Sequence, residues 1–599
     1  MLGVVVILVG RLIELQIFKH REYLRMAREN AARISPIYPP RGWMTDRYGE
    51  ILVTNESRFS LIVLPYLITD ENRDLTAGRL EKFTHIPKKE FLQKLGNASG
   101  RFRAVTLRRI ISKELATRLV ELEAQLPGVV VEQRPTRRYR KGNLLAHVEG
   151  YVGEVTTEEL SKLARAGYAQ KDFIGKDGIE KQFDAYLRGR RGGQQIEVDV
   201  RGRPIRLTEM VEPVPGMSLK LTVDSGLQEE VEDALGEEWG SVIVMDAKTG
   251  AVRALASRPT FDPTDVDAGL DARGHPFLNR ALSAYPPGST FKVATLMAAL
   301  EKGVATLDET IECPGWYRVG SRVAKCWKLD GHGKLNVIEG LVWSCDVVFY
   351  ELGRRLEIAP IAEYATRLGF GSATRIDLPN EKDGFIPTEN WKQETLSEPW
   401  YPGDFINHAI GQGFIQVTPI QMAKVFAQLA TGMTVAPYVV EEIEDLNREV
   451  AYRHTDVEEK SEPLKVDTEN LDLVRKALRQ AVLRGTGVAA RVAGLPAAGK
   501  TGTAENPGPA HAWFAAFAPW EDPEIVIVVF VEHGEHGDRA AARAAGRVLK
   551  WYKENRATNL VFEEAEFPPQ KMIQGPYAPE NFATKVDRVE TRLATSESP

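Results

Sequence analysis

Strand-forming runs lie near both ends of the stretch 211–560, and largely helical patterns separate them. SVIVMDAKTGAVRALAS (241–257) carries two β-branched runs around a Lys-Thr-Gly turn, and FAAFAPW and IVIVVFVEHG follow within 514–534. Apolar helical patterns lie between these runs, at 291–300, 335–355 and 418–431. This arrangement predicts one α/β (α+β) domain whose first and last strands share a sheet.

The rest of the chain differs in character from this stretch. Residues 19–210 are charged and loop-rich and lack long apolar runs, which is typical of an elongated module with a modest core. Residues 561–599 are proline-rich and polar, which is typical of a tail. Because 599 residues are too many for one core, these changes mark the expected domain boundaries: 19–210, 211–560 and 561–599.

Residues 1–18 predict a membrane anchor. LGVVVILVG (2–10) is purely apolar, but it is shorter than the roughly 20 residues that span a bilayer. Two interpretations fit: the outer part of an anchor whose start is missing, or a buried amphipathic helix. The position at the end of the chain, before a cationic polar stretch, favours the anchor. The positive-inside rule would place those cations in the cytoplasm, so we infer topology from the chemistry instead.

Composition excludes one broad class of function. Hydrophobic residues make up 43% and charged residues 27% of the chain, which are ordinary globular values. The net charge of −6 is small, and charges of both signs are mixed along the sequence. No basic stripe of the kind that binds nucleic acid is visible, so no nucleic-acid partner is expected.

A serine precedes a lysine by one helical turn in YPPGSTFKVATLMAAL (285–300). Ser289 and Lys292 are at i and i+3, so their side chains are expected on the same face of a helix. A serine becomes a good nucleophile when a neighbouring base takes its proton, and a lysine with a lowered pKa can be that base. The S-x-x-K pattern alone is weak, because a helix cap followed by a surface lysine is far more common.

Two further motifs make this interpretation specific. The segment 344–346 (Ser-Cys-Asp) offers a second hydroxyl and a polar partner for a lysine. The segment 500–503 (Lys-Thr-Gly-Thr) is a strand-like run whose glycine allows a substrate backbone to approach closely. S-x-x-K, S-x-[ND] and K-T-G, in this order, are the motifs of penicillin-binding proteins and class A β-lactamases.

Over nearly its whole length the chain resembles the class B penicillin-binding proteins, the D,D-transpeptidases that cross-link peptidoglycan. Two stretches of the catalytic region, 402–423 and 482–490, are similar to family motifs. The family's N-terminal motifs are matched by RGWMTDRYGEIL (41–52), RRYRKGNLLAHVEGYVG (137–153) and GKDGIEKQFDAYLRG (175–189). Asp346, where Asn is commoner, and WKLDGHGKL (327–335) point to the elongation-type branch, penicillin-binding protein 2.

The resemblance implies a fold and a place for the molecule. The fold would be a serine-transpeptidase domain with a central antiparallel sheet flanked by helices. An elongated pedestal domain of the dimerisation type and a membrane anchor would precede it. The protein would sit in the bacterial cytoplasmic (inner) membrane through a single-pass anchor, with its catalytic domain outside the cytoplasm.

The resemblance also implies a role for each motif residue. Ser289 would attack the penultimate D-alanine carbonyl of a stem peptide and form an acyl-enzyme, with Lys292 as the base. Ser344 and Asp346 would relay or anchor the proton, and Lys500 would attract the substrate carboxylate. The substrate-binding residues would be Thr501, Gly502 and Thr503, and the backbone N–H groups of Ser289 and Thr503 would form an oxyanion hole.

The expected partners are stem peptides and β-lactams, with a RodA-type glycan polymerase and an MreC-type scaffold. Two alternatives remain: a D,D-carboxypeptidase or β-lactamase-like hydrolase on the same fold, and a non-catalytic β-lactam sensor or scaffold. The long N-terminal module argues against the first alternative. The intact motif residues Ser289, Lys292 and Lys500 argue against the second.

The only three cysteines of the chain, Cys313, Cys326 and Cys345, lie close together with His332. Cys3His is a recognised set of structural zinc ligands, although the usual C-x-x-C pairs are absent. The alternatives are a Cys313–Cys326 disulfide with Cys345 free, and three buried thiols. A zinc ion would brace the 344–346 segment, and with four protein ligands it would leave no position open for water. The chemistry itself requires no cofactor.

Two other motifs are interpreted as structural. Arg41, Asp46, Arg47 and Glu180 carry paired charges at a domain junction, where ion pairs are far more often structural than catalytic. Gly411–Gly413 (Gly-Gln-Gly) is interpreted as a buried turn beside the site rather than as a phosphate-binding loop.

Overall fold

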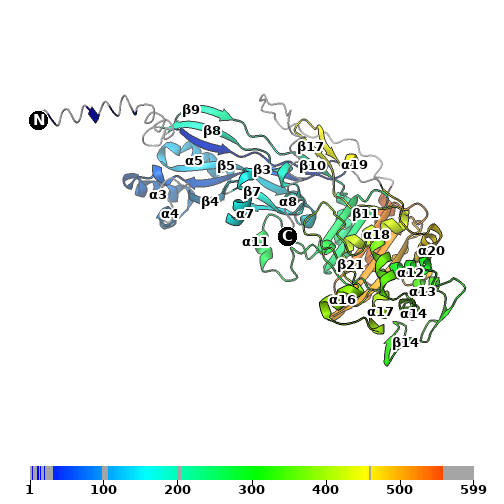
Figure 1. Ribbon diagram of the computed structural model, residues 1–599. Helices are drawn as coiled ribbons and strands as arrows, with labels where there is room; N and C mark the ends of the chain where they lie inside the picture. The colour runs from blue at the N-terminus through cyan, green and yellow to red at the C-terminus, as the bar shows by residue number, and fades with distance from the viewer. Residues whose placement is uncertain are drawn as a thin grey trace. The chain divides into compact units, whose positions relative to one another are not determined.

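The computed structural model describes residues 32–96, 105–170, 172–198, 204–457 and 461–556, with Gly3, Gly10, Arg11, Glu14 and Lys19 (Figure 1). The expected anchor lies almost entirely outside the described residues, and the expected tail at 561–599 lies wholly outside them. Among the described residues, no helix combines the length and the apolar character needed to cross a membrane. The chain falls into two compact units, of which the larger holds Tyr38–Arg190 and Val214–Glu563.

The smaller unit contains a three-stranded antiparallel sheet in the order β1-β8-β9. Its strands are β1 (Ala32–Ile37), β8 (Gly192–Val198) and β9 (Pro204–Val211). In its register, Ala32 pairs with Glu197 and Gly193 with Val211.

The catalytic motifs lie around a five-stranded sheet in the order β12-β11-β21-β20-β19. All of its neighbouring strands are antiparallel. The strands are β11 (Gly240–Asp246), β12 (Val252–Arg258), β19 (Ala498–Asn506), β20 (Gly508–Ala518) and β21 (Ile525–Val531). β11 pairs with β21, for example Val242 with Val529. The prediction that the first and last strands share a sheet is therefore confirmed.

Helices cover both faces of this sheet, and the strand sequences show why. Successive side chains of a strand point to opposite faces, and β11 and β21 are apolar at almost every position. Val242 and Val244 join a core with α10 (Ser225–Leu235) and α21 (Ala541–Asn555). Their neighbours on the strand, such as Ile243, point to the other face and join the core that contains α12 (Lys292–Glu301) and α18 (Pro419–Thr431). Figure 1 shows α18 lying against the sheet.

A second, seven-stranded sheet has the order β18-β17-β10-β2-β3-β4, with β5 paired to β3. Its strands are β2 (Met44–Thr45), β3 (Ile51–Val63), β4 (Val105–Ile111), β5 (Val129–Tyr139), β10 (Ser218–Leu221), β17 (Val440–Glu444) and β18 (Val450–Arg453). Leu219 of β10 pairs with Met44 of β2 in parallel. Strands from both sides of residue 211 thus share one sheet. Three helices accompany β3, β4 and β5 and share a core with them: α3 (Asp70–Thr84), α4 (Lys88–Gly96) and α5 (Lys113–Glu121).

Two expected helices are interrupted. The pattern of 174–193, with glycine-rich turns at its ends, predicts a single helix, but the segment holds the end of strand β7 (Phe173–Asp177) and two short helices, α8 (Gly178–Gln182) and α9 (Asp184–Leu187). The helix expected over 335–355 is two helices, α13 (Val337–Val342) and α14 (Asp346–Leu356). The break falls at Ser344, whose φ of 53° is left-handed and cannot continue a right-handed helix.

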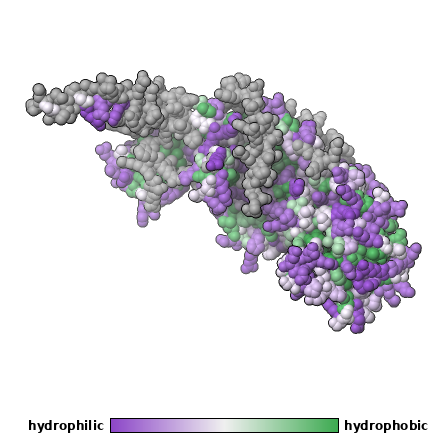
Figure 2. Space-filling view, in the orientation of Figure 1, coloured by the Kyte–Doolittle hydropathy of each residue, from purple (hydrophilic) through white to green (hydrophobic). Residues whose placement is uncertain are grey.

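Shorter elements complete the larger unit. The remaining helices are α6 (Ala146–Glu149), α7 (Thr157–Leu163), α11 (Val266–Leu270), α15 (Ile358–Arg367), α16 (Glu389–Leu396), α17 (Pro402–Ala409), α19 (His454–Val457) and α20 (Thr468–Arg484). The remaining strands are β6 (Tyr151–Glu154), β13 (Ile311–Cys313), β14 (Trp316–Val319), β15 (Arg322–Lys325) and β16 (Gly333–Leu335). On the face shown in Figure 2, hydrophilic residues cover much of the described surface and hydrophobic ones are interspersed among them.

The charged residues of the N-terminal motifs form buried ion pairs. Arg41 lies 2.6 Å from Glu180 and 2.9 Å from Asp184, and Arg137 also pairs with Glu180. Asp46 accepts hydrogen bonds from the backbone N–H groups of its own turn. These contacts support the structural interpretation of Arg41, Asp46 and Glu180, because each of these groups has a partner within the protein.

Candidate active site

The serine of the first motif lies in a turn that leads into a helix. Gly288–Phe291 form a 3-10 turn, and α12 begins at Lys292. The expectation that Ser289 and Lys292 lie on one α-helix is therefore wrong. The spacing of three still places their side chains on one side, because a 3-10 turn repeats every three residues. Ser289 is half-buried, whereas Lys292 is fully buried.

This turn packs directly on the third motif. Gly288 has a φ of +54°, and a Cβ added there would lie 2.3 Å from the carbonyl oxygen of Thr503. Only glycine therefore allows the turn to approach β19 so closely. The N–H of Gly288 donates to Gly411 O at 3.0 Å, and Gln412 Nε2 donates to Thr503 O at 3.4 Å. The Gly-Gln-Gly segment is thus the turn beside the site that the sequence predicts.

The three motifs meet at two buried lysine side chains. Lys292 Nζ donates to Ser344 O at 2.9 Å and to Asp346 Oδ1 at 2.8 Å. Lys500 Nζ donates to Ser344 Oγ at 2.8 Å and to Thr501 O at 2.8 Å. Lys292 Nζ is 3.5 Å from the same Ser344 hydroxyl. Ser344 Oγ therefore connects the two lysines, and Asp346 neutralises the charge of one of them.

Burial and the nearby charge of Lys292 lower the pKa of Lys500 well below its usual value, although Asp346 opposes this shift. A buried ammonium loses the hydration that stabilises its charge, and a second cation adds repulsion. Lys500 is therefore suited to hold a neutral amine that can accept a proton.

The strand that carries the third motif is the last strand of its sheet. Within the described residues β19 pairs with β20 and has no second neighbouring strand, so its other edge is suited to receive an extended peptide. Gly502 keeps this strand close to the serine turn, because a Cβ there would lie 2.9 Å from Pro287 O. Thr501 Oγ1 lies 2.7 Å from Thr486 Oγ1, a contact that sequence reasoning missed. In the sequence, Thr486 stands out only as a member of the stretch 482–490 that is similar to a family motif.

Trp327 is a further residue of the site that was missed. Its backbone N–H donates to Asp346 Oδ2 at 2.9 Å. Its indole Nε1 donates to the carbonyl oxygens of Trp343 and Ser344, at 3.2 and 3.1 Å. The only signal in the sequence was its place beside Cys326 in the motif at 327–335.

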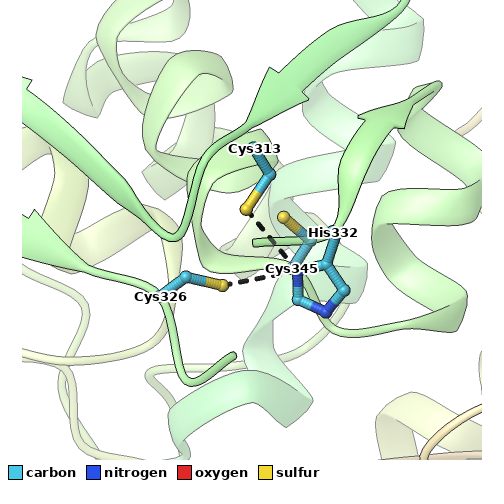
Figure 3. A group of neighbouring side chains, drawn as sticks. All are labelled: Cys313, Cys326, His332 and Cys345. Carbon is cyan, nitrogen blue, oxygen red and sulfur yellow. Dashed lines mark hydrogen bonds between the residues drawn. The ribbon is translucent and has the colours of Figure 1, made fainter. Parts of the chain in front are cut away.

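The four residues predicted as zinc ligands converge from separate elements (Figure 3). Cys313 ends β13, Cys326 follows β15, His332 precedes β16 and Cys345 precedes α14. Their ligand atoms all lie within 4.8 Å of one another. All three cysteines are buried and none is in a disulfide, so the Cys313–Cys326 disulfide alternative does not hold.

The spacing within this Cys3His group fits a tetrahedral metal site. His332 Nδ1 lies 3.5 Å from the Sγ atoms of Cys313 and Cys326. Zinc bonds of about 2.3 Å to sulfur and about 2.0 Å to nitrogen separate tetrahedral S and N ligands by about 3.5 Å. The hydrogen bond between the two thiols lowers the pKa of Cys326 and raises that of Cys345, so the pair shares one proton that a bound metal would displace.

The family model of the penicillin-binding protein transpeptidase domain matches residues 240–550, more than half of the chain. The chain belongs to the penicillin-binding proteins. The model of the penicillin-binding protein dimerisation domain matches residues 36–221 of this penicillin-binding protein. Both matches agree with the resemblance drawn from the motifs, and they confirm the fold class.

Relatives place this penicillin-binding protein in the PBP2 group. The peptidoglycan D,D-transpeptidase MrdA of Escherichia coli K12 is 31% identical over 89% of this chain and 89% of its own length. The solved complex between PBP2 and MreC from Helicobacter pylori superposes with a TM-score of 0.76 at 27% identity, covering 88% of this chain and all of that chain. A solved peptidoglycan synthase complex that coordinates polymerization and crosslinking contains a chain with a TM-score of 0.69 and 29% identity, covering 92% of this chain and 96% of that one.

Proposed function

We propose that this protein cross-links peptidoglycan stem peptides through an acyl-enzyme on Ser289 during cell-wall elongation, and that β-lactams acylate the same serine. By its family it is a serine-type D-Ala-D-Ala transpeptidase. One observation carries the assignment of roles: Lys292, Ser344 and Lys500 form a continuous polar chain behind the turn that presents Ser289.

The chain of polar groups suggests a route for the proton in acylation. Lys292 passes a proton to Ser344, which passes its own to the neutral amine of Lys500. The neutral amine of Lys292 then takes the hydroxyl proton of Ser289, while Ser289 Oγ forms a bond to the carbonyl carbon of the penultimate D-alanine. The backbone N–H groups of Ser289 and Thr503 would stabilise the oxyanion.

The second half of the reaction reverses this route. The bond to the terminal D-alanine breaks, and its nitrogen receives a proton returned from Lys500 through Ser344 and Lys292. The amine of a second stem peptide then attacks the ester carbon and gives up a proton, while Ser289 Oγ leaves with one. This transfers the peptide to the acceptor and restores the enzyme.

Lys500 also links substrate binding to this route. The terminal carboxylate of the donor peptide would lie beside Lys500 and the hydroxyls of Thr501 and Thr503. A carboxylate there stabilises the ammonium form of Lys500 and so favours the arrival of the proton. In this way Lys500 serves both roles, carboxylate recognition and proton acceptance.

Labelling with a fluorescent penicillin tests the nucleophile. The wild-type protein is expected to become covalently labelled, and Ser289→Ala is expected to lose the label completely. Ser283→Ala is the matched control, because it removes a hydroxyl in the same stretch of chain that donates to Asn279 O and lies outside the catalytic motifs. Following the acyl-enzyme over hours separates a transpeptidase, which releases it slowly, from a hydrolase, which turns it over quickly. Unchanged labelling of Ser289→Ala would overturn the proposal.

We also propose that Cys313, Cys326, His332 and Cys345 hold a structural zinc ion. When bound, the ion would supply no chemistry to the substrate, because four protein ligands fill a tetrahedral site. Its effect would be to join the 344–346 segment to the strands around Cys313 and Cys326. Elemental analysis of the purified protein tests this, with one zinc per chain expected and none overturning it.

Location, partners and domain limits complete the proposal. We propose a single-pass anchor within residues 1–18 in the bacterial cytoplasmic membrane, with the catalytic domain outside the cytoplasm. The pedestal would span 19–210, the transpeptidase domain 211–560 and the tail 561–599.

An MreC-type scaffold and a RodA-type polymerase are the proposed partners, supported by the PBP2–MreC complex and the synthase complex. Co-purification of the full chain with each candidate from membranes tests these contacts.

A further inference from the structure

We propose that Trp327 is a positioning residue that holds Ser344 and Asp346 in their reactive arrangement, through its indole and its backbone N–H. The proposal rests on the proposed function, since it concerns residues assigned to proton transfer. It adds a residue that lies outside the three catalytic motifs.

The first contact is with the carboxylate of Asp346. Its Oδ1 accepts from Lys292 Nζ at 2.8 Å, and its Oδ2 accepts from the backbone N–H of Trp327 at 2.9 Å. The two donors occupy different oxygens of one carboxylate. The orientation of the group facing Lys292 therefore depends on where the backbone of Trp327 lies.

The second contact is with the main chain at Ser344. The indole N–H of Trp327 is shared between the carbonyl oxygens of Trp343 and Ser344, at 3.2 and 3.1 Å. The Ser344 carbonyl also accepts from Lys292 at 2.9 Å. Trp327 and Lys292 thus both donate to the carbonyl oxygen of Ser344. Through this bond the indole is attached to the turn that carries the Ser344 hydroxyl.

The backbone of Ser344 needs such support. Its φ of 53° lies in the left-handed region, which a serine rarely adopts and which persists only when surrounding contacts enforce it. The backbone N–H of Ser344 donates to Leu341 O at 3.2 Å, so the turn is held from one side by α13. The indole of Trp327 supplies a constraint on the carbonyl side. Without it, Lys292 alone holds the carbonyl of Ser344, and we expect Ser344 Oγ to shift relative to Lys500.

Packing alone does not explain the place of Trp327. The residue is 57% exposed, so it fills little of the core. Its indole N–H nevertheless donates to two carbonyl oxygens. Its ring also meets His332 edge-on, with centroids 5.2 Å apart. An exposed tryptophan whose N–H points inward at the catalytic turn is suited to orient that turn rather than to stabilise the fold.

The test compares Trp327→Phe with Trp316→Phe. Phenylalanine keeps a ring at position 327 and removes the indole N–H. Trp316 is a matched control, because it is 46% exposed on β14 and takes no part in the hydrogen bonds described above. The measurement is the kinetics of acylation by a chromogenic β-lactam, resolved into the affinity of the encounter complex and the rate constant of acylation.

For Trp327→Phe we expect an acylation rate constant about tenfold lower at saturating β-lactam, because a displaced Ser344 hydroxyl stabilises the transition state less well without changing the binding of the β-lactam. The affinity of the encounter complex, the melting temperature and the metal content should stay at wild-type values. Trp316→Phe should acylate like the wild type. Trp327→Gln, which restores a side-chain N–H donor, should recover part of the rate.

Three outcomes would overturn the proposal: an unchanged rate constant in Trp327→Phe, an equal loss in Trp316→Phe, or a loss that accompanies a lower melting temperature or loss of metal. The last outcome would show a structural role. Failure of the proposed function would look different, because the wild-type protein itself would then resist acylation.

Discussion

Lys500 Nζ donates a 2.8 Å hydrogen bond to Ser344 Oγ, and this contact joins two residues that are 156 positions apart in the chain. Both side chains are buried, and Lys292 reaches the same hydroxyl from the other side. The hydroxyl of Ser344 therefore sits between two amines of which one, Lys500, favours the neutral form.

Replacing Lys500 by arginine should abolish proton acceptance at this position while keeping the positive charge. An arginine stays protonated at all accessible pH values, whereas the pKa of Lys500 is lowered well below its usual value. We expect β-lactam acylation to slow by about 100-fold or more, the usual range for loss of an acid–base group. Lys328→Arg, at an exposed position, is the control. Acylation of Lys500→Arg at near wild-type rates, with the fold intact, would refute the proton route through Lys500.

Gly288→Ala should disable the serine turn. The added Cβ would lie 2.3 Å from Thr503 O, and the residue already has a φ of +54°. Gly303→Ala is the matched control, since Gly303 has a φ of +65° but no atom within 4 Å of an added Cβ. The control should cost only about 1–2 kcal/mol of backbone strain. Labelling rates with fluorescent penicillin should fall at least tenfold for Gly288→Ala alone, and equal rates in the two variants would contradict the geometry.

Removing one ligand of the Cys3His group should remove the proposed metal. In Cys313→Ser the Sγ that lies 3.5 Å from His332 Nδ1 is lost. We expect less than one metal ion per chain and a melting temperature lower by roughly 5–10 °C, as for a loss of a few kcal/mol in a domain of this size. A strong chelator should lower the melting temperature of the wild type and leave Cys313→Ser unaffected. A wild-type protein indifferent to the chelator would count against the metal.

Glu149→Gln should change how stability depends on pH. Glu149 is fully buried, and neither of its carboxylate oxygens has a hydrogen-bond partner in the described part of the chain. Burial raises its pKa to about 8, Arg137 opposes the shift and Glu180 adds to it. The folded protein thus keeps this proton up to about pH 8, whereas the unfolded chain loses it near the usual value of 4.5.

The sign follows from proton counting. Between these two values the folded state binds more protons, so the free energy of unfolding falls as pH rises. Urea unfolding at pH 5 and pH 8.5 should show a loss of a few kcal/mol in the wild type that is absent in Glu149→Gln. Glu158→Gln, on the exposed face of α7, should follow the wild type. Parallel pH dependence in Glu149→Gln and the wild type would show that Glu149 is ionised at neutral pH.

Much of the catalytic domain was predictable because its signals are local. Continuous apolar, β-branched runs marked β11 and β21, and their positions at the two ends of the domain implied that the two strands share a sheet. The order of three short motifs identified the family before any contact was known. The single helix expected over 335–355 was wrong, because its apolar pattern continues through Ser344 while the backbone there turns left-handed. Hydrophobic periodicity reports which side chains are buried, and it does not report the conformation of one residue held by distant partners.

The sequence by itself determined the chemistry that this chain can perform, since nucleophile, lysines, carboxylate and cysteines are properties of residue type and order. The tertiary structure alone decided their relations: that Ser344 bridges Lys292 and Lys500, that Trp327 holds Asp346, and that no disulfide joins Cys313 to Cys326. The physical reason is range. Hydrogen bonds and charge interactions act over a few ångströms, so their partners are set by how the sheets and helices bring remote segments together. The pKa of Lys500 is likewise lowered only in the folded protein, where its side chain is buried.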